Sequence, residues 1–296
     1  MGTPPATSGA GAPALLLLAH GTRERRGAEE MAMLLDQLRA RVGLAEAGWL
    51  EDFAEPDAVT AAQRLLDAGA KALVTLPFLV LGAGHAKSDV PAGVWDVRDA
   101  FPSLPVSHGR VLGLHPSLFT LAQRRVEAVA GPRAAVRERA DEVLLVTGAG
   151  SSDPDANGDL AKAARFLAEC TGHRWVDTAY AGVTWPTADV ALRRAAAAGA
   201  SRVVLFSWSL LAGLLEQRVT AMAAEVTAQT GLEVVDAGRL GPDPLVADAV
   251  LDRYREAVAG DARMNCDLCQ YRIPVPGRER RVGLPSAGGT GERVGQ

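Results

Sequence analysis

Two histidines follow apolar segments that we expect to be buried strands. His20 comes directly after Leu15–Ala19 in the segment AHGTRERRG. His85 comes shortly after Leu73–Val80 in the segment GAGHAKSDVP. Parallel sheets bind ligands beyond the carboxyl ends of their strands, where imidazole nitrogens can hold a divalent metal or act as a base. His20 and His85 are therefore our candidate catalytic residues and metal ligands, although a single histidine after a strand often only forms loop hydrogen bonds.

Two carboxylates flank the end of another expected strand, at residues 49–54. Glu51 and Glu55 occur in the segment LEDFAEP, and either could share a metal with the histidines or accept a proton. Our choice for the third metal ligand is Glu55. The alternative is that Glu55 supplies negative charge to the first turn of a helix beginning near Pro56.

Basic residues surround both histidines in the sequence. Arg23, Arg25 and Arg26 lie within a few residues of the first histidine, and Lys87 lies two residues after the second. A cluster of this kind usually forms a solvated face. Beside a pocket it would instead suit a ligand that carries several negative charges.

The chain contains an internal repeat. Residues 56–81 align without gaps to residues 186–211, with nine of the 26 positions identical. Alanine richness inflates this count, so a chance likeness between two alanine-rich helices is the alternative. In the second copy, Ala149 and Leu215 stand at the positions of the two histidines. We therefore expect the chemistry to reside in the first copy.

Strands and helices alternate in each copy, which predicts βαβ units and an α/β fold. Residues 28–42 and 57–68 have the apolar spacing of helices that cover a sheet. We expect two tandem domains, residues 1–137 and 138–260, each a parallel sheet flanked by helices. Residues 261–296 show no periodicity and predict a flexible tail.

Composition restricts the class of protein. The 296 residues are 48% hydrophobic and 22% charged, which excludes general disorder. Thirty-one basic against 35 acidic side chains give a net charge of −4, which is not the footprint of a general nucleic-acid binder. The longest nearly apolar run, Val203–Leu215, is too short to cross a bilayer. We expect neither a nucleic-acid nor a membrane partner.

The three cysteines do not form a disulfide framework. Cys170 stands alone, whereas Cys266 and Cys269 have metal-ligand spacing in the segment MNCDLC. Two thiolates are half of a ligand set, so the pair binds a metal or cluster or consists of incidental thiols. The odd cysteine count and the lack of an export signal predict a cytoplasmic protein.

Four segments together resemble one known family. AHGT (19–22), FAEP (53–56), LPFLVLGAGHAKSDVP (76–91) and SSDPDAN (151–157) resemble the sirohydrochlorin chelatases of the CbiX type, which are class II tetrapyrrole chelatases. The resemblance covers about residues 14–260 and includes the tandem layout of the long form. MNCDLC is similar to an M-x-C-x-x-C segment of some long members that is associated with an iron–sulfur cluster. Unlike some long members, this chain has no histidine-rich region.

The resemblance implies an enzyme that inserts Co²⁺ into sirohydrochlorin for cobalamin biosynthesis. His20 and His85 would hold the metal and take up pyrrole protons. Thr22, Arg23 and Lys87 would contact the substrate, which is ringed by carboxylates. The tail cysteines would hold a 4Fe–4S cluster, and a homodimer in which each chain gives the same pair would complete its four ligands.

Three alternatives stay open from the sequence. The inserted metal could be iron, for sirohaem, or nickel, because imidazole accepts all three ions. A carrier would bind the tetrapyrrole or metal without turnover. A redox protein would use the C-x-x-C cysteines, and its activity would survive His20→Ala.

Overall fold

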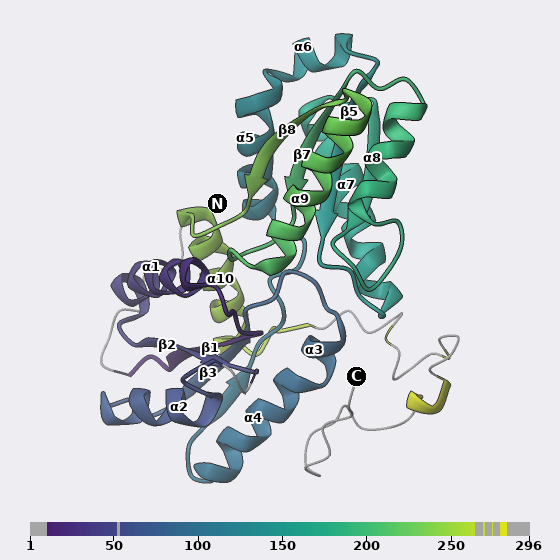
Figure 1. The fold of residues 1–296 in the computed structure, drawn as a ribbon. Helices are drawn as coiled ribbons and strands as arrows, with labels where there is room; N and C mark the ends of the chain where they lie inside the picture. The colour runs from purple at the N-terminus through teal and green to yellow at the C-terminus, as the bar shows by residue number, and fades with distance from the viewer. Residues whose placement is uncertain (1–10, 52–53, 264–268, 270–273, 275–278, 283–296) are drawn as a thin grey trace. The chain divides into compact units, whose positions relative to one another are not determined.

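The computed structural model describes residues 11–51, 54–263, 269, 274 and 279–282 (Figure 1). The described chain forms two compact units, each built on a four-stranded sheet. The strand orders are β2-β1-β3-β4 and β6-β5-β7-β8, and every pairing is parallel. This confirms the α/β fold with two sheets of the same topology.

The first sheet is built around β1 (Ala14–Ala19), whose six residues are all buried. Its sequence ALLLLA is apolar at every position, as expected of a parallel strand covered on both faces. β2 (Ala45–Trp49) and β3 (Leu73–Pro77) pair with β1 on its two sides, and β4 (Val106–His108) pairs with β3. The carboxyl ends of β2, β1 and β3 therefore lie side by side.

The second strand lies earlier in the chain than the apolar pattern predicted. We expected residues 49–54, whereas β2 covers Ala45–Trp49. Its sequence AEAGW lacks the β-branched residues that mark most strands. Gly48 serves close packing, since a Cβ there would lie 2.7 Å from Cα of Ala58 in α2.

Helices cover both faces of the first sheet. α2 (Ala58–Asp67) and α4 (Asp89–Ala100) share one apolar core with β1 and β3. Asp57 caps α2, because its side chain accepts a hydrogen bond from the Thr60 N–H at 2.7 Å. Figure 1 shows α1 (Arg25–Val42) and α10 (Pro244–Val258) on the other face. The short α3 (Gly84–Lys87) lies between β3 and α4.

The second unit repeats this arrangement. α8 and α9 share an apolar core with β5 and β7, whereas α5 and α7 contact each other and the remaining strands. The elements are β5 (Glu142–Gly148), β6 (Trp175–Tyr180), β7 (Arg202–Ser207), β8 (Glu233–Arg239), α5 (Pro116–Ala130), α6 (Arg133–Glu138), α7 (Pro154–Thr171), α8 (Ala188–Ala197) and α9 (Leu214–Thr230). A 3-10 turn, Glu279–Arg281, lies outside both sheets.

The compact units do not follow the linear boundary at residues 137 and 138 that we expected. α5 belongs to the second unit, where it contacts β7 and β8, although it follows β4 in the chain. Residues 247–258 of α10 belong to the first unit, although they follow β8. Residues 24–30, which include the first turns of α1, group with the second unit. The helix that follows the last strand of each copy thus belongs to the other compact unit.

Candidate active site

The two histidines meet at the carboxyl edge of the first sheet. His20 follows β1 directly, and His85 lies in α3 after the loop that leaves β3. Their Nε2 atoms are 3.0 Å apart, and their rings meet edge to face. The prediction that two strand-end histidines converge is therefore consistent with the geometry.

Glu51 completes a group of three metal-binding side chains with the histidines. One Oε atom of Glu51 lies 3.5 Å from His20 Nε2, and one ligand atom from each of the three residues falls within 4.8 Å of the others. In the part of the chain that the structure describes, this is the only group of three or more His, Cys, Asp or Glu side chains so arranged. Two imidazoles and one carboxylate suit a divalent transition metal.

Backbone hydrogen bonds fix Glu51 beside His20. The Leu50 N–H donates to the Ala19 carbonyl at 2.9 Å, and the Glu51 N–H donates to the His20 carbonyl at 3.1 Å. The parallel pairing thus continues past the end of β2. Glu55, our choice from the sequence, is exposed and is not part of the group. Because β2 ends at Trp49, the nearer carboxylate is Glu51.

Asp89 orients the second histidine. Its carboxylate and Nδ1 of His85 form a hydrogen bond across one turn of chain, at the junction of α3 and α4. This contact leaves Nε2 of His85 to face His20 and Glu51, an arrangement typical of metal-binding histidines. Asp89 was not among the residues expected in the site, although its spacing of four residues from His85 is the signal for a contact on a helix.

The charges of the site are unequal. Burial lowers the pKa of His20, and the neighbouring His85 lowers it further. The hydrogen bond to Asp89 raises the pKa of His85, and the same bond lowers the pKa of Asp89. An extra proton in the metal-free site is therefore held more readily by His85 than by His20.

The group faces solvent on one side. The side chains of His20 and Glu51 are 45% and 32% exposed. A metal held here keeps coordination positions that the protein does not fill. The site can therefore receive a metal ion and present it to a further ligand.

The other residues expected to bind substrate lie next to the histidines in the chain. Thr22 is half-buried and Arg23 exposed, in the segment between β1 and α1. Lys87 is half-buried at the last position of α3. They thus follow the same two strands whose ends carry the histidines.

The second unit lacks this group at the corresponding edge. Ala149 follows β5 where His20 follows β1, and Leu215 occupies the place of His85 in the repeat. The Ala181 N–H donates to the Gly148 carbonyl at 2.9 Å, which makes Gly182 the counterpart of Glu51. None of the three counterparts has a ligand atom, so the second unit offers no equivalent metal site.

The tail cysteines are only partly described. Cys266 lies outside the described residues, and Cys269 is half-buried. Cys170 is half-buried in α7 of the second unit.

Among the described residues, no helix is both long and apolar enough to cross a membrane.

Curated proteins of known activity resemble this chain over most of its length. A sirohydrochlorin cobaltochelatase of Priestia megaterium is 31% identical over 264 residues, which are 88% of this chain and 85% of that protein. A sirohydrochlorin ferrochelatase of Bacillus subtilis is 26% identical over 248 residues, which are 83% of this chain and 92% of that protein.

Solved structures share the fold. SirB from Bacillus subtilis with Fe³⁺ has a TM-score of 0.72 at 24% identity, covering 86% of this chain and all of that one. SirB from the subspecies spizizenii in complex with cobalt has a TM-score of 0.69 at 24% identity, covering 84% of this chain and 96% of that one. The CbiX family model matches residues 14–129 and 143–257, one match for each copy of the repeat. This chain belongs to the CbiX family.

Proposed function

We propose that this protein is a chelatase that inserts a divalent metal ion, Co²⁺ in the first place, into sirohydrochlorin. The observation that carries the proposal is the group formed by His20, Glu51 and His85 at the carboxyl edge of the first sheet. Membership of the CbiX family supplies the substrate class, because its curated relatives act on sirohydrochlorin.

Metal insertion requires the exchange of metal-bound water for ring nitrogens and the loss of two pyrrole protons. His20 and His85 would each donate an Nε2 lone pair to Co²⁺, and Glu51 would donate an oxygen and reduce its charge. The open side of the group would leave coordination positions for the macrocycle. As the metal passes to the ring, the two released imidazoles could each accept one pyrrole proton. Asp89 would stabilise the imidazolium of His85.

The carboxylates of the macrocycle call for cationic and hydrogen-bonding partners. Thr22, Arg23 and Lys87 follow the strands that carry the histidines, which supports the proposal that they bind these groups. A guanidinium binds a carboxylate through two parallel hydrogen bonds, whereas Lys87 would act as a point charge.

The identity of the inserted metal needs an argument separate from that for the substrate. Two imidazoles and a carboxylate accept Co²⁺, Ni²⁺ and Fe²⁺, so the donor set alone does not select among them. The cobaltochelatase is the more similar of the two curated relatives described above, which favours cobalt. Iron insertion for sirohaem is the second candidate.

The iron–sulfur cluster and the homodimer stay predictions. Cys266 and Cys269 would supply two thiolates from each chain, and a cluster with four cysteine ligands would join two chains. We place the protein in the cytoplasm, where free thiols of this kind persist.

Turnover separates a chelatase from a carrier. Purified full-length protein is mixed without oxygen with metal-free sirohydrochlorin and Co²⁺, and the absorption change on metal insertion is followed. A chelatase converts many equivalents of sirohydrochlorin per chain, faster than the uncatalysed reaction. Spectral change limited to one equivalent would identify a carrier and contradict the proposal.

A further inference from the structure

A basic cavity of about 220 Å³ lies in the second unit, near the amino-terminal ends of its strands. This is the end of the sheet opposite to the one where Ala149 follows β5. The cavity lies between α6, the last turns of α7 and the residues just before β6. Its charged and titratable lining consists of Arg133, Arg137, Arg165, Glu169, His173 and Arg174. The lining thus contains four arginines and one glutamate.

Two of the four arginines have an evident structural role. Arg165 pairs with Glu169 one turn away on α7. The Nε–H of Arg133 donates to the backbone carbonyl of Glu169 at 3.1 Å, as cations near the end of a helix often do. By contrast, neither Arg137 nor Arg174 has a hydrogen bond or ion pair with any residue that the structure describes.

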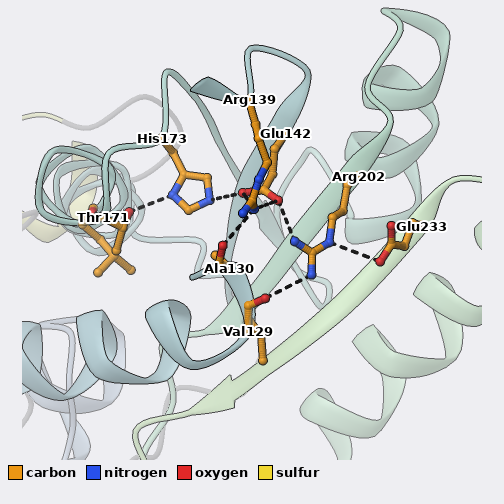
Figure 2. Close-up of polar contacts among 9 residues, drawn as sticks. Val129, Ala130, Arg139, Glu142, Thr171, His173, Arg202 and Glu233 are labelled. Atoms are coloured by element: carbon orange, nitrogen blue, oxygen red, sulfur yellow. Dashed lines mark hydrogen bonds and ion pairs between the residues drawn. The ribbon is translucent and has the colours of Figure 1, made fainter. Parts of the chain in front are cut away.

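The neighbouring acidic group is already neutralised. Glu142 is buried, and Arg139 and Arg202 both donate to its carboxylate, as Figure 2 shows. Arg202 also pairs with Glu233 at 3.2 Å. Charges of both signs are balanced within this network, so it offers no counter-charge to the cavity.

His173 separates this network from the cavity. Its Nδ1 lies 2.8 Å from the Thr171 hydroxyl, and its Nε2 lies 3.3 Å from one Glu142 oxygen. Burial lowers the pKa of His173. His173 thus contacts the network and also lines the cavity, and burial makes it harder to protonate than an exposed histidine.

We propose that this cavity binds a phosphate-bearing anion of the pyrophosphate type. Arginines line it from α6, from α7 and from the residue just before β6, so a ligand can be contacted from more than one side. A pyrophosphate group presents oxygens in several directions and carries about the charge that the lining leaves uncompensated. Drug-sized ligands occupy roughly 300–1,000 Å³, so 220 Å³ suits a compact anion.

Calorimetric titration of the full-length protein with inorganic pyrophosphate tests this assignment. Sodium chloride keeps the ionic strength constant during the titration. This is needed because salt screens the interactions of exposed charges, so a change in ionic strength could alter the measured heat without specific binding. The wild-type protein should bind pyrophosphate saturably. Arg137→Gln and Arg174→Gln should each weaken binding by about tenfold or more, the scale of a lost charge-assisted hydrogen bond. Since neither side chain has a hydrogen bond or ion pair with a described residue, both variants should fold normally.

Arg193→Gln is the matched control. Arg193 is in the same unit but pairs with Glu225 and Gln229 on the surface, so this variant should bind pyrophosphate within about twofold of wild type. ADP in place of pyrophosphate tests whether the phosphate groups of a nucleotide bind, and competition between the two would support a shared site. Citrate binding as tightly as pyrophosphate, heat that never saturates, or equal weakening in Arg193→Gln would each overturn the proposal.

Discussion

The Nε2 atoms of His20 and His85 lie 3.0 Å apart, although 65 residues separate them in the chain. Two ring nitrogens at this distance need a proton between them, because two lone pairs would repel. Asp89 raises the pKa of His85 and burial lowers that of His20, so an extra proton on this pair is held by His85. A metal bound by both Nε2 atoms must displace it.

Cobalt binding should therefore release about one proton per chain where His85 is still protonated. Because the folded-state pKa of His85 is raised, this release extends above the ordinary histidine value of 6.5 and vanishes at more alkaline pH. Cobalt affinity should fall as the pH falls through the same range. Calorimetry in buffers of different ionisation enthalpy measures the number of protons.

Asp89→Asn should shift this behaviour to lower pH. The amide lacks the negative charge that stabilises the imidazolium, so the pKa of His85 should drop and proton release at neutral pH should diminish. Above that range, the loss of an orienting partner should still weaken cobalt binding about tenfold or more. Unchanged proton release in Asp89→Asn would show that the proton is held elsewhere.

Two glutamates four residues apart form a matched pair for testing the carboxylate ligand. Glu51→Gln should weaken Co²⁺ binding by at least about tenfold, because a charged oxygen donor is lost from the group. Glu55→Gln removes the same charge from an exposed position and should change affinity less than about twofold. Equilibrium titration with Co²⁺ compares them, and a larger effect of Glu55→Gln would restore our choice from the sequence.

Much of the site followed from sequence. Buried strands were recognisable in Leu15–Ala19 and Leu73–Val80, and the ends of parallel strands are where side chains converge. The carboxylate was misjudged because β2, with the sequence AEAGW, has no β-branched residue and only one large apolar side chain. An error of a few residues in that strand moved the expected ligand from Glu51 to Glu55.

The exchange of α5 and α10 between the two units could not be predicted from the sequence. α5 and α10 have similar lengths, and each follows the last strand of its copy. The repeat therefore gives no indication that either helix packs in the other unit. Specific contacts hold α10 in the first unit, including Arg253, which donates to the Leu112 carbonyl at 2.7 Å. The basic cavity was equally hidden, because its arginines are spread over residues 133–174 without a pattern.

His108 should limit stability in acid. Burial and the nearby Arg98 lower its pKa from 6.5 to about 4. Between these two pH values, the unfolded chain binds a proton at His108 and the folded protein does not. Stability should rise with pH between these values and be lost as the pH falls from 6.5 toward 4. Between neutral pH and about pH 5, wild type should lose roughly 2 kcal/mol more than His108→Gln. Urea unfolding of both proteins measures this difference, and equal losses would contradict it.

Protein purified without oxygen should be brown and contain iron if the tail cysteines bind a cluster. Cys266→Ser should abolish the visible absorption and leave most cobalt insertion intact, because the tail is remote from His20 in the sequence. Iron-free wild-type protein from iron-replete cells would refute the cluster. Loss of insertion in colourless Cys266→Ser protein would show that the cluster supports catalysis or folding.

The role of the two histidines in metal insertion is tested most directly by the rate of cobalt insertion into sirohydrochlorin by His20→Ala and His85→Ala, measured beside wild type. His108→Gln is the control, since it removes a histidine of the same unit that is not in the metal-binding group. We expect a loss of at least about 100-fold in each alanine variant, the scale of a positioned acid–base group, and a near-wild-type rate for the control. A near-wild-type rate in either folded alanine variant would contradict the assignment of metal insertion to this site.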